Sequence, residues 1–238
     1  MSAKAPCIIA SARPWNKNMA ASLQRKTGRK FVLISDPTAL TAERLDALAP
    51  QYVFLPHWSH RIPPEVYERH ECIIFHMTDL PFGRGGSPLQ NLIVRGFRDT
   101  RISAIRCVRE LDAGPVYLKR DLSLAGSAEE IFIRAAAIME DMIVHILSTR
   151  PRPRPQRGKP TTFKRRTPEH GNLTAARSLG EAYDLIRMLD AEGYPAAFLN
   201  AGPFRIEFTR ASRKVGGIVA DAKIEFISKS SADHDQDR

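Results

Sequence analysis

A histidine at the end of an apolar run is the residue of this sequence whose position most clearly suggests chemistry. His76 directly follows the run 72–75, and the loop 80–86 behind it is rich in glycine and proline. Ser87 and Pro88 then suit the first turn of a helix, because serine caps helices and proline is tolerated at their first position. In open α/β sheets, ligands bind beyond the carboxyl ends of the strands. We therefore expect a ligand site around His76.

A carboxylate follows this histidine at a distance that suggests a partnership. Asp112 lies 36 residues later (112 − 76) and stands in a turn, 110–115, between two apolar runs. If the two strands are neighbours, we expect both side chains at the same end of the sheet. A carboxylate beside a histidine favours the cationic ring, and such a cation stabilises negative charge on a carbonyl oxygen by roughly 3–4 kcal/mol. On spacing alone, the alternative is structural: His76 would bind a loop carbonyl and Asp112 would cap a turn.

Several common enzyme classes find no support in the sequence. The first strand-to-helix turn, 11–15, has no glycine, although a dinucleotide pyrophosphate needs glycines there. No P-loop, GxSxG or HExxH pattern occurs. His57 and His60 have the spacing of a metal pair, but no further ligand residues cluster near them, and we expect no metal. The three cysteines are scattered without metal spacing, which indicates buried thiols in a reducing cytoplasm.

The residues around His76 and Asp112 resemble, in order and spacing, those of the folate-dependent formyltransferases. That family carries a strand ending in histidine, then Leu-Pro, Arg-Gly and a proline that opens a helix, and later an Asp-x-Gly turn. The matching residues are His76, Leu80, Pro81, Arg84, Gly85, Pro88, Asp112 and Gly114. The resemblance implies a Rossmann-like α/β fold and the transfer of a formyl group from N10-formyltetrahydrofolate to a primary amine.

The resemblance also implies roles for particular residues. An unprotonated amine attacks the formyl carbon, the His76 cation steadies the oxyanion, and Asp112 orients His76 and helps to remove the amine's proton. The family's pterin pocket is lined by the loop after the third strand and by backbone just before the catalytic aspartate. The residues expected to bind the folate donor are His57, Trp58, His60, Arg84, Gly85, Val108, Glu110 and Leu111.

One position departs from the family pattern. Members usually carry an asparagine two residues before the histidine as a second oxyanion donor, and this chain has Ile74 there. An isoleucine side chain donates no hydrogen bond. Either His76 and a backbone N–H suffice, or Thr78 or Asn91 supplies the missing donor to the substrate. The departure also leaves open an altered activity, or a folate-binding relative without turnover.

The region after residue 160 bears on the acceptor. It is similar to formyltransferases that act on nucleotide-linked amino sugars, which carry an Arg-rich stretch, an Ile-Arg pair and a Tyr-Pro-x-x-Phe pattern. The matching residues are Arg165, Arg166, Ile186, Arg187, Tyr194 and Phe198. Arg165 and Arg166 are expected to contact a diphosphate, because a guanidinium fork suits phosphate. A nucleotide-linked amino sugar or a similar small metabolite is thus the preferred acceptor, and a siderophore-type hydroxylated amine is another. Methionyl-tRNA is a further alternative, although residues 160–228 are too few and too helical for that enzyme's usual β-barrel domain.

Short apolar runs alternate with amphipathic segments over the first 150 residues. Strands are expected at 6–12, 30–35, 51–55, 71–75, 101–107 and 116–119, and helices at 16–26, 41–48, 63–70, after Ser87 and at 127–148. This alternation predicts an α/β fold whose mainly parallel sheet is covered by helices on both faces. The helix 127–148 has the clearest signal, because Ser127 and Glu130 suit a capping box and apolar residues recur at helical spacing.

The basic charge is concentrated in one segment. Eight basic residues lie in 150–166 without an acidic one, so the formal net charge of +10 leaves 10 − 8 = +2 for the rest of the chain. Alternating proline and arginine there favour a stiff spacer, which is either a solvated linker or a phosphate-binding surface. We predict a catalytic domain at 1–150, a linker at 151–168, a small αβ subdomain at 169–228 and a disordered tail at 229–238. No apolar run reaches the roughly 20 residues that a membrane helix needs, so no membrane association is expected. The sequence leaves a homodimer open.

Overall fold

The structure, a computed structural model, describes residues 5–227. The chain forms two compact units, which divide between Arg165 and Arg166, and each unit is described by itself. The tail predicted to be disordered, 229–238, lies outside the described residues.

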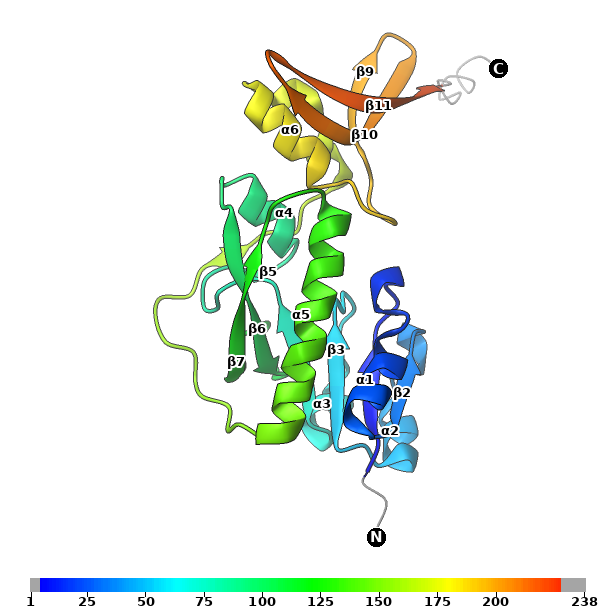
Figure 1. Cartoon of the computed structure of the whole chain (residues 1–238), viewed down its shortest axis with the longest axis vertical. Helices are drawn as coiled ribbons and strands as arrows, with labels where there is room; N and C mark the ends of the chain where they lie inside the picture. The colour runs from blue at the N-terminus through cyan, green and yellow to red at the C-terminus, as the bar shows by residue number, and fades with distance from the viewer. Residues whose placement is uncertain (1–4, 228–238) are drawn as a thin grey trace, which may run out of the picture. The chain divides into compact units, whose positions relative to one another are not determined.

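A six-stranded sheet forms the centre of the first unit, in the order β2-β1-β3-β4-β6-β7 (Figure 1). The strands are β1 Cys7–Ala10, β2 Phe31–Ile34, β3 Tyr52–Pro56, β4 Cys72–His76, β6 Asp99–Arg106 and β7 Val116–Ser123. The first four are parallel, whereas β6 is antiparallel to β4 and β7 is antiparallel to β6. The predicted α/β fold with a mainly parallel sheet is confirmed.

Helices cover both faces of this sheet. They are α1 Met19–Thr27, α2 Ala42–Leu48, α3 Pro64–Arg69, α4 Pro88–Ile93 and α5 Ala128–Thr149. Because parallel strands connect by right-handed crossovers, α1, which leads from β1 to β2, lies on the face opposite to α2 and α3. α5 packs beside α1 and across β3, β6 and β7. The predicted capping box opens α5: the Ser127 hydroxyl accepts from the Glu130 N–H, and the Glu130 carboxylate accepts from the Ser127 N–H.

The proline- and arginine-rich segment 151–165 lies within the first unit and is hydrogen-bonded to it. Arg154 exchanges two backbone hydrogen bonds with Val116, with N···O distances of 2.7 and 2.8 Å. Further on, β8 Thr162–Phe163 pairs with β5 Arg84–Gly85, in the loop that follows His76. This segment is therefore fastened to both parts of the chain in which site residues are predicted.

The second unit contains one α-helix and a small antiparallel sheet within its described residues, 166–227. The helix is α6 Leu179–Arg187, and the strands β9 Ala197–Ala201, β10 Phe204–Lys214 and β11 Gly217–Phe226 pair in the order β11-β10-β9. In the sequence, apolar residues at helical spacing from Leu179 to Leu189 predict α6, and alternating apolar residues at 204–208 and 222–226 predict parts of β10 and β11, whereas no such pattern marks β9. Phe198, interpreted from the sequence as part of a motif, is a buried residue of β9 with the Arg205 guanidinium over its ring.

Candidate functional site

His76 is the last residue of β4 and is almost fully buried, with 7% of its surface exposed. Its Nε2 lies 2.8 Å from the carbonyl oxygen of Gly83, in the loop that the sequence places after the strand. Because a carbonyl only accepts, Nε2 carries a hydrogen and donates it. The protonation of the other ring nitrogen, Nδ1, therefore determines whether the imidazole is neutral or cationic.

That nitrogen faces Asp112. The distance from His76 Nδ1 to Asp112 Oδ2 is 3.5 Å, and the Asp112 side chain is 8% exposed. The same carboxylate oxygen accepts a hydrogen bond of 2.9 Å from the N–H of Gly85. Both ring nitrogens of His76 thus face oxygen acceptors, an arrangement that the doubly protonated ring satisfies in full. The structure brings together the two side chains that the sequence proposes as a pair.

The route by which they meet differs from the expectation. Because β6 is antiparallel to β4, the turn after β6 begins beside Cys72, whose carbonyl accepts from the Cys107 N–H, at the opposite end of β4 from His76. Asp112 reaches His76 because the turn 107–115 runs back along β4. The two side chains therefore meet as expected, but they do so through the folded-back turn, because β4 and β6 end at opposite edges of the sheet.

Two glycines permit this close approach of loops. A Cβ atom on Gly114 would lie 1.7 Å from the carbonyl oxygen of Arg106, and one on Gly85 would lie 2.4 Å from that of Phe163. Gly85 also has a φ of +101°, which side chains disfavour. Any other residue type at either position would therefore force the backbone to move. Both glycines lie beside Asp112: Gly114 is two residues after it, and the Gly85 N–H donates to its carboxylate.

Ile74 stands at the position where the family usually carries an asparagine. Ile74 lies two residues before His76 on the same strand, so both side chains project from the same face of the sheet. There Ile74 packs against the buried cluster that includes Cys72 and Cys107, and Trp58 packs against the same cluster. The substitution therefore turns a polar position beside the histidine into an apolar wall.

Neither proposed replacement for that asparagine has a free donor. Thr78 is completely buried, and its hydroxyl donates to the Gly83 carbonyl, 3.3 Å away. The Asn91 amide donates to the carbonyl oxygens of Gly86, Ser87 and Lys164, and its oxygen accepts from Arg95. Both side chains hold the loop after His76 in place, and their roles toward a substrate stay predictions.

His57 and Trp58, predicted to contact the folate, occupy the loop after β3. His57 Nδ1 accepts from Trp15 Nε1 at 2.9 Å and lies 3.1 Å from Asn16 Nδ2, so the ring hydrogen is on Nε2. Burial, with Arg13 nearby as a smaller cause, lowers the pKa of His57 from 6.5 to about 3. Trp58 Nε1 is buried without a hydrogen-bond partner in the described structure, and the exposed His60 ring lies against the Trp58 ring.

The neutral buried His57 predicts a pH dependence of stability. Between pH 6.5 and about 3, the unfolded histidine binds a proton that the folded one does not, so stability is lost as the pH falls through this window. The contribution is about 1.4 kcal/mol per pH unit. Urea unfolding of the wild type and of His57→Gln between pH 7 and pH 4.5 measures it. Equal pH slopes in the two proteins would contradict the burial of a neutral ring.

The other predicted folate contacts lie in the turn that carries Asp112. Within the described residues, nothing accepts a hydrogen bond from the backbone N–H groups of 108–111. The Leu111 side chain is 68% exposed, and Glu110 pairs with Arg84 through an N···O distance of 3.1 Å. Arg84 also binds Gln156, a residue that the sequence patterns do not single out.

The remaining predicted substrate residues fall on both sides of the unit boundary. Arg165, the last residue of the first unit, is exposed, and its backbone lies close against Gly86. Arg166 begins the second unit and donates to the His170 carbonyl. Ile186 is a buried residue of α6 and thus has a packing role. The described residues contain no cluster suited to a metal ion and no helix long and apolar enough to cross a bilayer.

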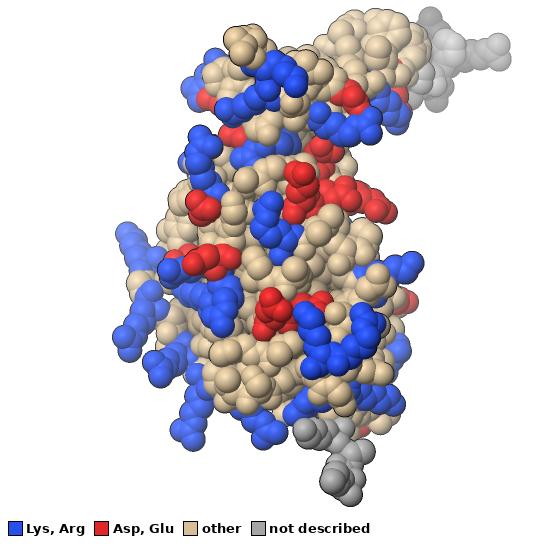
Figure 2. Space-filling view, in the orientation of Figure 1, with Lys and Arg blue, Asp and Glu red and all other residues tan. Residues whose placement is uncertain are grey.

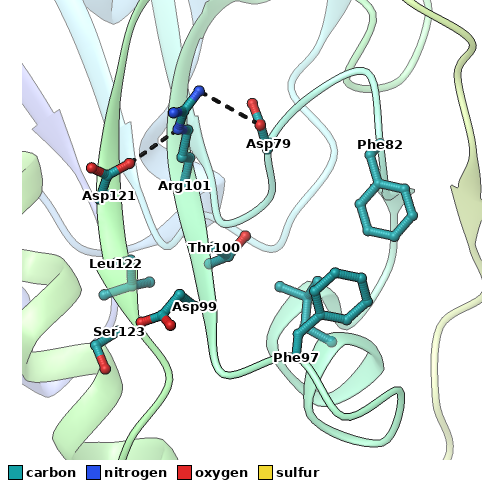
Figure 3. A pocket seen from close by; sticks show the side chains of 10 residues that line it. Asp79, Phe82, Phe97, Asp99, Thr100, Arg101, Asp121, Leu122 and Ser123 are labelled. Carbon is teal, nitrogen blue, oxygen red and sulfur yellow. Dashed lines mark hydrogen bonds and ion pairs between the residues drawn. The ribbon is translucent and has the colours of Figure 1, made fainter.

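A surface hollow of about 700 Å³ shares none of the predicted site residues. Figure 3 shows Phe82 and Phe97 on one side of it and Arg101 between Asp79 and Asp121 on the other. Phe82 directly precedes Gly83, whose carbonyl binds His76. The hollow is therefore walled in part by the loop that also forms the candidate site.

Comparisons with known proteins identify relatives of this chain. A family model described as the methionyl-tRNA formyltransferase C-terminal domain matches residues 168–225. A solved structure named methionyl-tRNA formyltransferase from Clostridium thermocellum is 47% identical, covers 93% of this chain and 99% of its own, and superposes with a TM-score of 0.90. A curated methionyl-tRNA formyltransferase from Thermodesulfovibrio yellowstonii is 23% identical over 197 residues, which are 78% of this chain and 63% of that protein.

More distant structures share the fold. A sugar N-formyltransferase from Shewanella sp. FDAARGOS_354 is 14% identical with a TM-score of 0.63, and the alignment covers 91% of this chain and 96% of that one. The chain spans less than two thirds of the length of the first curated relatives that it matches. The Clostridium thermocellum relative, by contrast, matches over nearly its whole length at high identity. The chain therefore belongs to the folate-dependent formyltransferase family.

Proposed function

We propose that this protein transfers the formyl group of N10-formyltetrahydrofolate to the amine of a methionyl-tRNA. The reaction rests on one observation: a buried histidine and a buried aspartate, 3.5 Å apart, beside a loop whose Gly85 N–H donates to the aspartate. The acceptor rests on the 47% identity with a structure named methionyl-tRNA formyltransferase, which covers 93% of this chain. The preference for a sugar acceptor drawn from the sequence is replaced by this alternative.

The groups beside the pair suit a folate donor. A pterin ring presents flat apolar faces and a polar edge, and such rings bind between apolar walls and backbone hydrogen-bonding groups. The N–H groups of 108–111 have no acceptor within the described residues, and Leu111 and Ile74 supply apolar surface. Trp58 Nε1 is a further buried donor left without a partner there.

The donor supplies a formyl group bound to nitrogen, and the chain's residues prepare its transfer. A bond forms between the acceptor nitrogen and the formyl carbon, the bond from that carbon to folate N10 breaks, and a proton passes from the acceptor amine to the folate nitrogen. As the imidazolium, His76 places positive charge where the carbonyl oxygen becomes negative. Asp112 keeps the ring oriented and accepts the amine proton before it is passed on. Their burial keeps bulk water away from the reacting groups.

The basic segment supports a polyanionic acceptor. Six cationic side chains in 152–165 are exposed and have no ion-pair partner among the described residues: Arg152, Arg154, Arg157, Lys159, Lys164 and Arg165. In Figure 2, Lys and Arg side chains project along the side of the first unit where Figure 1 draws this segment. Because the segment is hydrogen-bonded to the unit, its charges are held in place, which favours contact with a phosphate backbone.

The small C-terminal unit is no argument against tRNA. From the sequence alone, the short length of this region favours a small-molecule acceptor. A model of the methionyl-tRNA formyltransferase C-terminal domain nevertheless matches residues 168–225. The sugar N-formyltransferase named above supports the fold alone, because it is only 14% identical.

An acceptor panel tests the proposal. The purified protein is mixed with N10-formyltetrahydrofolate and either initiator methionyl-tRNA, a nucleotide-linked amino sugar or an N-hydroxylated ornithine, and release of tetrahydrofolate is followed. We expect release with the tRNA alone, together with formylmethionine in the hydrolysed product. Turnover of a small amine without tRNA would replace the acceptor. Folate binding by calorimetry without any turnover would identify a binding protein instead.

Removing charge from the basic segment should weaken use of the tRNA. With Arg152, Arg154, Arg157 and Arg165 changed to glutamine, we expect kcat/KM for the tRNA to fall about 10- to 100-fold and its salt slope to fall by about 3. A matched control removes the same charge from exposed positions elsewhere: Lys17, Arg25, Lys30 and Arg44. Equal losses in the two variants would show that net charge, rather than this segment, attracts the acceptor.

A further inference from the structure

We propose that Gln156 is a positioning residue for Asp112, and that the segment 151–165 is part of the framework of the active site rather than a spacer. The inference rests on the proposed function in that Asp112 is taken to act in formyl transfer. It is carried by hydrogen bonds that the Gln156 amide makes to both loops of the site.

The Gln156 side chain bridges these two loops. Its Oε1 accepts from Arg84 Nε at 3.2 Å and from Arg84 Nη2 at 2.8 Å. Its Nε2 donates to the carbonyl oxygens of Asp112 at 2.7 Å and Gly114 at 2.9 Å. A guanidinium can only donate and a carbonyl can only accept, so the orientation of the amide is determined by its partners.

The turn that receives these bonds needs an external support. Asp112 has a φ of +52°, in the left-handed region that residues other than glycine rarely adopt and that surrounding contacts must maintain. Within the described residues, no other side chain donates to the backbone of 107–115. Gln156 thus holds the backbone of Asp112 through its carbonyl oxygen, while the Asp112 carboxylate accepts from the Gly85 N–H.

Gln156 is itself anchored at close range. Two residues before it, Arg154 exchanges backbone hydrogen bonds with Val116 at the start of β7. After it, the N–H of Thr161 donates to the Pro81 carbonyl, and β8 pairs with β5. The segment therefore crosses from the strand that follows the Asp112 turn to the loop that follows His76, and Gln156 lies between its two attachments.

Two substitutions separate the halves of this bridge. Gln156→Glu keeps an oxygen for Arg84 but turns a second oxygen toward the carbonyls of Asp112 and Gly114, which it repels. Gln156→Met keeps the length of the side chain and removes both halves. Gln24→Glu, at an exposed position of α1, is the control for the change of charge.

We expect both Gln156 variants to lose about tenfold in kcat, because a small displacement of a reacting group is costly, while KM for the folate donor stays within about twofold. The pH dependence of kcat should change as well, which a loss of folded protein alone would not produce. Unchanged kcat and pH dependence in both variants would overturn the inference.

Hydrogen exchange provides a test that does not depend on turnover. In Gln156→Met, we expect the hydrogen-bonded amides of 107–115, those of Cys107 and Ala113, to exchange about tenfold faster, and peptides of β4 to exchange as in the wild type. If the wild type itself transfers no formyl group, the proposed function fails, but the exchange rates still decide whether Gln156 positions the turn. Exchange of 107–115 at the wild-type rate would contradict the positioning role.

Discussion

Changing Asp112 to asparagine is expected to lower kcat for formyl transfer by about 10²–10⁴-fold, the usual contribution of a positioned acid or base. Asparagine has nearly the same shape, and its oxygen can still accept from the Gly85 N–H. What is lost is the negative charge 3.5 Å from His76 Nδ1 and the ability to take the amine proton. Single-turnover measurements with saturating donor and tRNA report this step without product release.

Asp121→Asn is the matched control for this change. Asp121 has an exposed side chain on β7 and pairs with Arg101 at 3.0 Å, and the proposed mechanism assigns it no role. We expect its turnover to equal that of the wild type. Turnover of Asp112→Asn within about threefold of the wild type, with the protein folded, would remove Asp112 from the mechanism.

His76→Gln has the second largest expected effect, a loss of about 10²–10³-fold in kcat, as for the removal of one oxyanion donor. Glutamine can still donate to the Gly83 carbonyl, so the loop keeps its main contact with β4. It cannot carry the positive charge that the carbonyl oxygen meets as it becomes negative. The measurement is again single-turnover transfer, with circular dichroism to confirm the fold.

His145→Gln, a change at a half-buried position of α5 outside the candidate site, serves as the control for loss of a histidine. The double variant of His76 and Asp112 adds a sharper comparison. When two residues act as a unit, removing either one already removes their joint contribution. We therefore expect the double variant to be little slower than the slower single variant. Losses that multiply instead would mean that the two side chains act independently.

Much of the first unit follows from local sequence signals. The runs around Ile8, Val53 and Ile73 are apolar at nearly every position because their strands are covered on both faces, and that pattern predicts them well. The start of α5 is equally predictable, because a capping box satisfies its first N–H groups by neighbouring residues alone. Local hydrogen bonding and burial thus account for most of the sheet and its helices.

The features that the sequence does not reveal depend on contacts between distant segments. The antiparallel direction of β6 and the folding back of the turn 107–115 are set by pairing with β4, which no local pattern encodes. Strands of two residues, such as β5 and β8, are too short for a periodic signal. Gln156 lies in a stretch whose composition favours a spacer, and only its bonds to Arg84 and Asp112 distinguish it.

The candidate site divides in the same way. His76 and Asp112 stand out because their spacing matches a known family, whereas the commitments of Thr78 and Asn91 to loop carbonyls become visible only in three dimensions. In a sequence, polar residues near a histidine look like substrate-binding residues. In the structure, these two side chains instead hold the loop that follows His76. Composition alone cannot separate these two uses of a polar side chain.

The most direct test of the proposed site is the structure of the protein bound to a stable folate analogue that carries a formyl group at the N10 position. We expect the formyl oxygen to lie beside the His76 ring, where the charge of the imidazolium reaches it, and the pterin edge to lie against the N–H groups of 108–111. A folate bound elsewhere, such as in the hollow beside Phe82 and Phe97, would contradict the assignment of His76 and Asp112.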